Sequence, residues 1–210
     1  MSVFTEFLTT SFCTMTLNEF IERYDLDGAV ILLEGKRNVL DADREKLIAL
    51  GKFLASGSSK MIFRSGNAEG SDFLFSQGVA AVNRQRLQVI TPYDGHRKKA
   101  NLAYDTVSLD EINLASEPDI IYASKENKKI ENQVNRYVEG ERDKYAMKAA
   151  YIIRDTVKVL GTGNIPQVTF GIFYDDIRKP MEGGTGHTMR VCLKHEVPLI
   201  DQRVWFNWIS

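Results

Sequence analysis

The segment 168–188, VTFGIFYDDIRKPMEGGTGHT, decides the fold of this chain. Val168–Tyr174 is an apolar run of strand length, and Met181–Thr188 (MEGGTGHT) places three glycines within four positions. An amphipathic stretch, Thr188–Lys194, comes next, and a second apolar run, Val197–Ile200, follows it. A strand, a glycine-rich turn, a helix and a strand form the arrangement in which backbone N–H groups at a helix start bind phosphate.

A second glycine-rich run has the same surroundings. Ser65–Asp72 (SGNAEGSD) follows the apolar residues Met61–Phe63, and apolar positions at helical spacing predict a helix over 70–83. Ser71 or Asp72 then lies in the first helical turn, where a side-chain oxygen caps free N–H groups.

A third loop, Glu34–Asn38 (EGKRN), follows the apolar run Ala29–Leu33 and precedes a helical pattern that Asp41 opens. All three loops therefore lie after a strand and before a helix. In a parallel α/β sheet such loops gather at the carboxyl edge, where ligands bind. Each loop alone is equally typical of a tight turn without a ligand, but their shared placement favours a binding site.

The remaining pattern alternates between strands and helices. Strands are predicted at 29–33, 60–64, 87–91, 119–123, 168–174 and 197–200. A long helix is predicted over 142–160, and the polar stretch 92–118 is predicted to be a long loop that acts as a lid or substrate loop. This alternation predicts one α/β domain with a mostly parallel sheet and helices on both faces.

Composition narrows the class of protein. The 210 residues are 43% hydrophobic and 26% charged, as in an ordinary globular domain. Lys+Arg number 27 and Asp+Glu 28, a formal net charge of -1 that disfavours nucleic acid as a partner. Cys13 and Cys192 lie far apart, so no disulfide framework or zinc site is predicted. No bilayer-spanning stretch or signal peptide is evident, and a cytoplasmic location is expected.

The ends of the chain are expected to pack on this domain. We predict an N-terminal arm and short helix over 1–27, a Rossmann-like domain over 28–201, and an aromatic tail over 202–210. Thr16–Glu19 (TLNE) has the pattern of a capping box, which would start the short helix. Trp205 and its aromatic neighbours are expected to dock on the core or on a second subunit.

The glycine-rich runs resemble those of a known superfamily. Ser65–Asp72 is similar to the Ser-Gly-Gly-Ala-x-Gly-x-Asp loop of the SLOG superfamily, which joins the DprA, LOG ("lysine decarboxylase-like") and YpsA-like proteins. Glu182–Thr188 resembles its Gly-Gly-x-Gly-Thr phosphate loop, and Gly35–Arg37 stands where its Gly-Ser-Arg often occurs. The resemblance covers roughly 28–201. It implies a modified Rossmann fold that binds a nucleotide or nucleotide-derived ligand, often as a homo-oligomer.

The resemblance leaves two functions open. LOG phosphoribohydrolases carry an acidic pair just after their phosphate loop, where this chain has Met189 and Arg190. Neither side chain replaces a carboxylate in acid–base chemistry. We therefore expect a nucleotide sensor or carrier, with an N-glycosidic hydrolase or transferase as the alternative and with Asp72 and Glu182 as its candidate catalytic carboxylates.

The predicted ligand site draws on all three loops, and neither a metal nor any other cofactor is predicted. Its residues are Gly35, Lys36, Arg37, Ser65, Gly66, Asn67, Gly70, Ser71, Asp72, Gly183, Gly184, Thr185, Gly186, His187 and Thr188.

Each loop has a predicted part in binding. Backbone N–H groups of Gly183–Thr188 and the hydroxyls of Thr185 and Thr188 are expected to hold phosphate, while Ser65–Asp72 meets the ribose or the base. Lys36 or Arg37 would supply positive charge. His187 either donates to the phosphate or is solvent-exposed. A valine at Gly184 or Gly186 is expected to block the ligand and to spare the fold.

Overall fold

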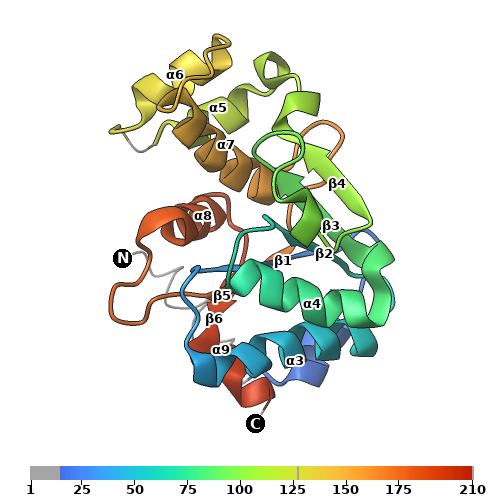
Figure 1. Cartoon of the computed structure of the whole chain (residues 1–210). Coiled ribbons are helices and arrows are strands. Elements are labelled where there is room, and N and C mark those ends of the chain that lie inside the picture. Colours follow the sequence, from blue (N-terminus) through green and yellow to red (C-terminus); the bar gives the residue numbers. More distant parts are fainter. Residues whose placement is uncertain (1–14, 127, 210) are drawn as a thin grey trace.

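A computed structural model describes residues 15–126 and 128–209 of this chain. It has an α/β Rossmann-like fold, built on a six-stranded parallel sheet with the strand order β4-β3-β2-β1-β5-β6 (Figure 1). The strands are β1 (Val30–Gly35), β2 (Ile62–Ser65), β3 (Leu87–Thr91), β4 (Asp105–Ser108), β5 (Phe170–Tyr174) and β6 (Leu199–Asp201). The predicted fold class is confirmed.

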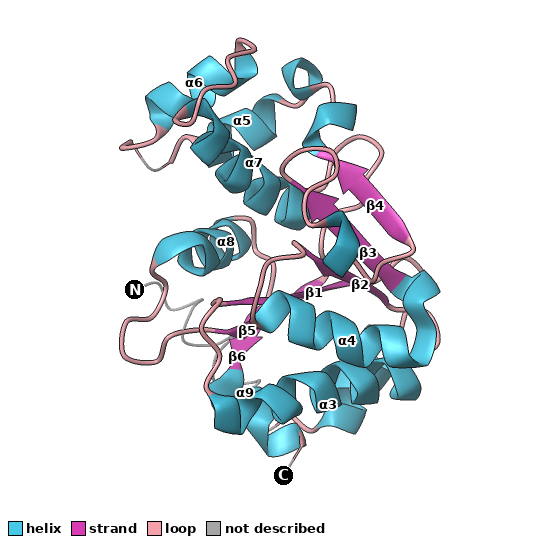
Figure 2. Ribbon diagram, in the orientation of Figure 1, coloured by secondary structure: helices cyan, strands magenta, loops and turns pink. Residues whose placement is uncertain are grey.

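Helices cover both faces of the sheet (Figure 2). One face is covered by α2 (Leu17–Tyr24), α3 (Asp41–Gly57), α4 (Ser71–Asn83) and α9 (Gln202–Trp205). The other is covered by α7 (Ala146–Leu160) and α8 (Gly183–Lys194). Two short helices, α5 (Pro118–Ser124) and α6 (Glu131–Val138), pack on α7 away from the sheet.

Strand β1 lies at the centre and is fully buried. It pairs in parallel with β2 on one side, where Val30 faces Ile62, and with β5 on the other, where Gly35 faces Tyr174. A strand buried on both faces is expected to be continuously apolar. The apolar run of β1 is broken at its carboxyl end by Glu34, and this exception marks the site described below.

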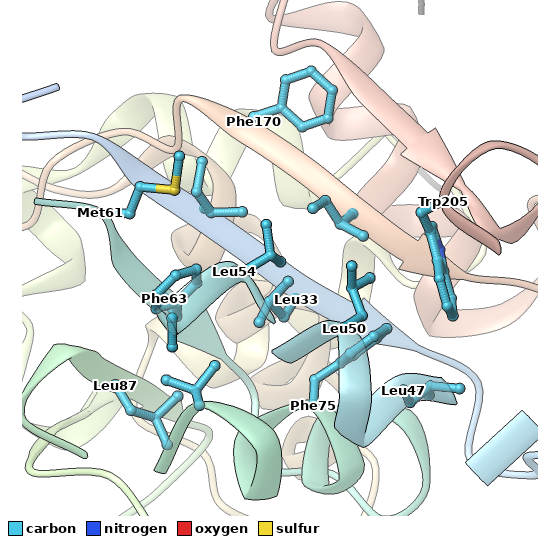
Figure 3. Close-up of a cluster of buried hydrophobic side chains, with 14 of the residues drawn as sticks. Leu33, Leu47, Leu50, Leu54, Met61, Phe63, Phe75, Leu87, Phe170 and Trp205 are labelled. Carbon is cyan, nitrogen blue, oxygen red and sulfur yellow. The ribbon is translucent and has the colours of Figure 1, made fainter. Parts of the chain in front are cut away.

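The main core lies between the sheet and the layer of α3 and α4 (Figure 3). Leu47, Leu50 and Leu54 recur at helical spacing on α3 and meet Leu33 and Phe63 from the sheet. This burial supplies the apolar driving force that holds the layers together. A separate apolar cluster packs α8 and the end of α7 on the opposite face.

Two elements differ from the sequence-based prediction. Residues 119–123, predicted as a strand, belong to helix α5, which begins at Pro118. A short apolar run fits a helix or a strand equally well, and proline is favoured in the first helical turn. The sheet instead ends in β4, which lies within the predicted loop 92–118 and pairs with β3. Its first two residues, Asp105 and Thr106, are exposed, and it is a short edge strand.

The ends of the described chain pack on the core. The predicted capping box is confirmed, because Thr16 accepts from the N–H of Glu19 and the Glu19 carboxylate accepts from the N–H of Thr16. The side chain of Trp205 is buried, and its indole N–H donates to the carbonyl of Phe173 at 2.8 Å. The part of the predicted arm that spans 1–14 lies outside the described residues. No helix in the described part is long and apolar enough to cross a membrane.

Candidate functional site

The three predicted loops meet at one edge of the sheet. Strands β2, β1 and β5 are adjacent and parallel, so the segments that follow Ser65, Gly35 and Tyr174 leave the sheet at its carboxyl edge. The loop after β2 also hydrogen-bonds to the loop after β1, because the Ser71 N–H donates to the carbonyl of Lys36. The predicted convergence of the loops is confirmed.

An open groove runs along this edge. Its inner part, a cavity of about 430 Å³, lies between the loop after β1, the start of α8 and the side of α7 that carries Tyr151 and Arg154. Its outer part, about 350 Å³, extends toward Asp175 and Lys179. Both parts are lined by the same five residues, Lys36, Arg37, Glu182, Gly183 and Thr185, and therefore form one continuous groove.

The rim of the groove consists of Lys36, Arg37, Lys179, Gly183 and Gly184. Arg37, Lys179 and both glycines are exposed, and Lys36 is partly exposed with its ammonium 5.3 Å from the centre of the Tyr174 ring. Within 15–126 and 128–209, none of the three cations forms an ion pair. The rim thus offers positive charge that is not neutralised by the protein.

The start of α8 adds backbone donors to the rim. The helix begins at Gly183, with Glu182 as an N-cap that makes no side-chain cap. The first N–H groups of an α-helix lack intrahelical acceptors and carry a partial positive charge. A Cβ on Gly184 would meet only the Asp155 carboxylate, at 3.4 Å, so space is open around this turn.

The second half of the predicted phosphate loop is structural. Gly186 is buried, and a Cβ there would lie 1.9 Å from the carbonyl oxygen of Met181. A valine at Gly186 would therefore disrupt the start of α8, and the prediction that it spares the fold is wrong. The Thr188 hydroxyl is also buried and donates to Glu34 at 2.9 Å, which leaves Thr185 as the predicted hydroxyl that lines the groove.

His187 points away from the groove into the layer between α7 and α8. Its Nε2 lies 3.0 Å from the Thr156 hydroxyl, which in turn accepts from the Ser124 hydroxyl. Burial lowers the pKa of His187. The histidine is neither exposed nor on the groove, so both sequence-based interpretations of it are wrong.

The loop after β2 is held by its own polar side chains. Ser71 is buried and donates to the Lys36 carbonyl at 2.7 Å, while the buried Ser65 accepts from the N–H of Asn67. Asn67 adopts a positive φ of 55° and donates to the carbonyls of His96 and Arg97. These side chains hold neighbouring loops in place and leave few free groups for a ligand.

Asp72 connects two loops. Its carboxylate accepts from the backbone N–H groups of Gly35 at 3.2 Å, Gly66 at 3.1 Å and Ala68 at 3.4 Å. It makes no side-chain cap on its own helix, for which Gly70 is the N-cap. The expected helix cap is wrong, because the carboxylate instead joins the loops after β1 and β2.

Glycines occur in these loops where other backbone comes close. A Cβ on Gly70, whose φ is +81°, would lie 2.0 Å from the carbonyl oxygen of Arg37, and one on Gly35 would lie 2.3 Å from that of Tyr174. The glycines are thus needed for loop packing as much as for ligand access.

A buried ion network forms the floor of the groove. Lys158 is 0% exposed, and its ammonium lies 2.6 Å from Glu34 and 2.9 Å from Asp155. The Arg154 guanidinium lies 2.8 Å from Asp155 and also donates to the carbonyl of Gly66. This ion network of Glu34, Arg154, Asp155 and Lys158 was not predicted from the sequence.

Burial and pairing act against each other in the ion network. Burial raises the pKa of Glu34 to about 7, in spite of the opposing charge of Lys158. Burial would also raise the pKa of Asp155, but Arg154 and Lys158 outweigh it and lower that pKa. In the same way the carboxylates outweigh burial and raise the pKa of Lys158. Asp155 and Lys158 are therefore charged at neutral pH, while Glu34 titrates near it.

One sequence feature could have revealed this network. Arg154, Asp155 and Lys158 interrupt the apolar face of the long helix that ends at Leu160. Charged side chains are almost never fully buried unless they are paired. Glu34 at the end of an apolar strand is their partner, but its position relative to the helix follows from the fold.

Two aromatic rings pack against Tyr151, which lines the inner part of the groove. Tyr93, His96 and Tyr151 pack edge to face, with ring centres 4.9 Å apart for Tyr93 and His96 and 5.7 Å apart for His96 and Tyr151. Burial, assisted by the nearby guanidiniums of Arg154 and Arg97, lowers the pKa of His96 to about 4. His96 is thus neutral at physiological pH. No group of three or more His, Cys, Asp and Glu residues in the described part could hold a metal ion.

No protein-family profile matches this sequence, and no curated protein matches it. Among solved structures, DNA processing protein A (DprA) from Helicobacter pylori is similar to this chain with a TM-score of 0.48 and 15% identity. The match covers 85% of this chain and 67% of that one. Because no family profile matches, membership of the SLOG superfamily stays a prediction.

This comparison corrects two expectations about function. The sequence predicted a small nucleotide as the ligand, bound by a sensor or carrier or cleaved by an N-glycosidic enzyme, and it disfavoured nucleic acid. The matched protein is described by its single-stranded DNA binding mode, which contradicts both expectations. The net charge of -1 is a sum over the whole chain, so it does not describe the cations gathered at one edge of the sheet.

Proposed function

We propose that the groove binds the sugar–phosphate backbone of a single-stranded nucleic acid. The observation that carries the proposal is the continuity of the groove, which is open at both parts and lined throughout by Lys36, Arg37 and the start of α8. Small-molecule sites usually enclose most of the ligand surface. An open groove suits a chain that enters at one end and leaves at the other.

Phosphate recognition would come from the rim. Gly183 and Gly184 have no side chain that would keep a ligand away from their N–H groups. The helix dipole of α8 also favours an anion beside them. Lys36 and Arg37, from the loop after β1, and Lys179, from the loop after β5, would add charge-assisted contacts. Glycines and cations that face one groove are the donors that a phosphodiester needs.

Carboxylates of the groove oppose this binding less than their number suggests. Asp72 is saturated by backbone N–H groups, and Asp155 is ion-paired with Arg154 and Lys158. Of the acidic residues that line the groove, Glu182 is exposed at the start of α8, Asp176 is partly exposed in the outer part, and the others are buried. We therefore expect Glu182→Gln to strengthen binding modestly.

Aromatic side chains favour a nucleic acid over another polyanion. Tyr151 lines the inner part of the groove, next to Arg154, whose guanidinium carbon lies 5.8 Å from the ring centre. Proteins that bind single strands combine a cationic groove with rings on which bases stack. The DNA binding of DprA is a property of that protein, and the proposal for this chain rests on its own groove.

The proposal is tested by fluorescence anisotropy with labelled single-stranded DNA and RNA of the same sequence. We expect Lys36→Ala combined with Arg37→Ala to weaken binding by roughly tenfold or more, since a hydrogen bond to a charged group contributes about 1.5–3 kcal/mol. Lys52→Ala combined with Lys60→Ala is the matched control, because Lys60 precedes β2 at the opposite edge of the sheet.

A comparison of the DNA and RNA affinities shows whether the protein distinguishes deoxyribose from ribose. Mononucleotides at the same phosphate concentration serve as competitors. Displacement of the strand by mononucleotides at equal concentration would contradict the proposal. So would equal losses of affinity in the rim variant and in its control.

A further inference from the structure

Helix α7 carries a row of side chains that leads out of the groove. Tyr145, the N-cap residue of α7, and Lys148, Tyr151 and Arg154 within the helix are spaced three residues apart, so they form one inclined ridge that winds around it. Aromatic and basic side chains alternate along this ridge. We call these four residues the α7 ridge.

Burial changes steadily along the α7 ridge. Arg154 is buried in the floor of the groove, and Tyr151 is partly buried at its inner wall. Lys148 and Tyr145 are exposed, and Tyr145 keeps 47% of its surface accessible. The ridge therefore begins inside the proposed binding site and ends on the open surface of the molecule.

Cations lie over both rings of the ridge. The ammonium groups of Lys144 and Lys148 lie 5.0 Å and 5.6 Å from the centre of the Tyr145 ring. The guanidinium carbon of Arg154 lies 5.8 Å from the centre of the Tyr151 ring. A ring flanked by cations offers a surface for a base and charges for the adjoining phosphates. An aromatic ring with cations beside it thus occurs at two places on the α7 ridge, at Tyr145 and at Tyr151.

The backbone that carries the Tyr145 ring is held in place without a ligand. The Asp143 carboxylate accepts from the N–H groups of Tyr145 and Ala146, both at 2.8 Å, and so caps the start of α7. Arg136 donates to Asp143 at 2.6 Å and supports it from α6. A fixed backbone at Tyr145 lowers the entropic cost of binding there.

We propose that a single strand leaves the groove along the α7 ridge, with one base stacked on Tyr145 and its phosphates beside Lys144 and Lys148. This proposal rests on the proposed function of the groove and adds a second contact region to it. Tyr151 follows Tyr145 by six positions, a rise of about 9 Å along the helix axis at 1.5 Å per residue. Two to three stacked nucleotides at about 3.4 Å each span that distance.

The test is a length series of single-stranded oligonucleotides, from about four to about sixteen nucleotides, which is the range of known single-strand sites. Affinity for the wild-type protein is expected to rise with length until the ridge is covered. Tyr145→Ala combined with Lys148→Ala should bind the shortest strands as the wild type does and lose roughly tenfold in affinity for long ones. Both side chains are exposed, so the fold is expected to be unaffected, and thermal unfolding checks this.

Tyr122→Ala combined with Lys194→Ala is the matched control. Tyr122 is 71% exposed, and the Lys194 ammonium lies 5.0 Å from its ring at the far end of α8 from the groove. Equal affinities of wild type and ridge variant at every length would overturn the proposal that the strand contacts the α7 ridge. They would leave the proposed binding in the groove unaffected. Equal losses in the control would also overturn it. A failure of all strands to bind the wild type would overturn the proposed function itself.

Discussion

The floor and the rim of the groove use charge in opposite ways. In the floor, Lys158 is buried and its charge is matched by Glu34 and Asp155. At the rim, Arg37 and Lys179 are exposed and form no ion pair with any described residue. The floor therefore holds β1, α7 and α8 together, whereas the rim has charge to offer a ligand. The comparison separates residues that shape the site from residues that would bind at it.

The largest difference is expected from Lys158→Met. It leaves Glu34 buried without its cation and Asp155 with Arg154 alone, and breaking a buried pair typically costs about 3–5 kcal/mol. Urea unfolding measures the change in the free energy of unfolding. Lys179→Met, at the rim, should change it by less than about 0.5 kcal/mol. Similar losses in the two variants would show that floor and rim are not distinct.

The glycines of α8 give the next comparison. Gly186→Ala places a Cβ against the Met181 carbonyl, so we expect a loss of about 3 kcal/mol or more, the upper range for overpacking. Gly184→Ala meets no backbone and adds helix propensity, so its stability should equal or exceed that of the wild type. Thermal unfolding of both variants decides the matter. A stable Gly186→Ala protein would contradict the observed packing of the turn.

Asp72→Asn tests the connection between two loops. The carboxylate accepts from three backbone N–H groups, and an amide presents one oxygen in place of two. We expect a loss of roughly 1.5–3 kcal/mol, the range for hydrogen bonds to a charged group. Hydrogen exchange should show faster exchange of the Gly35 and Gly66 amides. Unchanged exchange at both amides would mean that the loops are held in another way.

The pH dependence of stability reports on Glu34. Its pKa is raised from the ordinary 4.5 to about 7 in the folded protein, so the folded state binds more protons between these values. The contribution of Glu34 to stability is therefore fully present below about pH 4.5 and falls as pH rises to about 7. The difference in unfolding free energy between wild type and Glu34→Gln should decline over this window and stay level above it. A constant difference would refute the raised pKa.

Much of the fold could be predicted from local pattern. The apolar runs at β1, β2, β3 and β5 predicted the parallel sheet, and the loops after β1, β2 and β5 predicted its carboxyl edge. Strand β4 and helix α5 could not be distinguished in this way, because an exposed edge strand has no apolar pattern and Ile120–Tyr122 suits either state.

The site was predicted by position more than by role. Lys36, Arg37, Gly183 and Gly184 line the groove, their part in ligand binding stays a prediction, and Thr188 faces inward. Which face of α8 is buried depends on Glu34 and α7, which are distant in sequence. The ion network was missed for the same reason, since pairing across the fold makes buried charges tolerable.

The salt dependence of strand binding tests the central claim most directly. A protein that neutralises phosphates of a single strand loses affinity with a slope of about −0.7 in log K against log salt for each phosphate contact. Wild type should show a steep slope, and Lys36→Ala combined with Arg37→Ala should be shallower by about 1.4. The Lys52→Ala and Lys60→Ala control should keep the wild-type slope. Equal slopes in wild type and rim variant would contradict the assignment of phosphate binding to the rim.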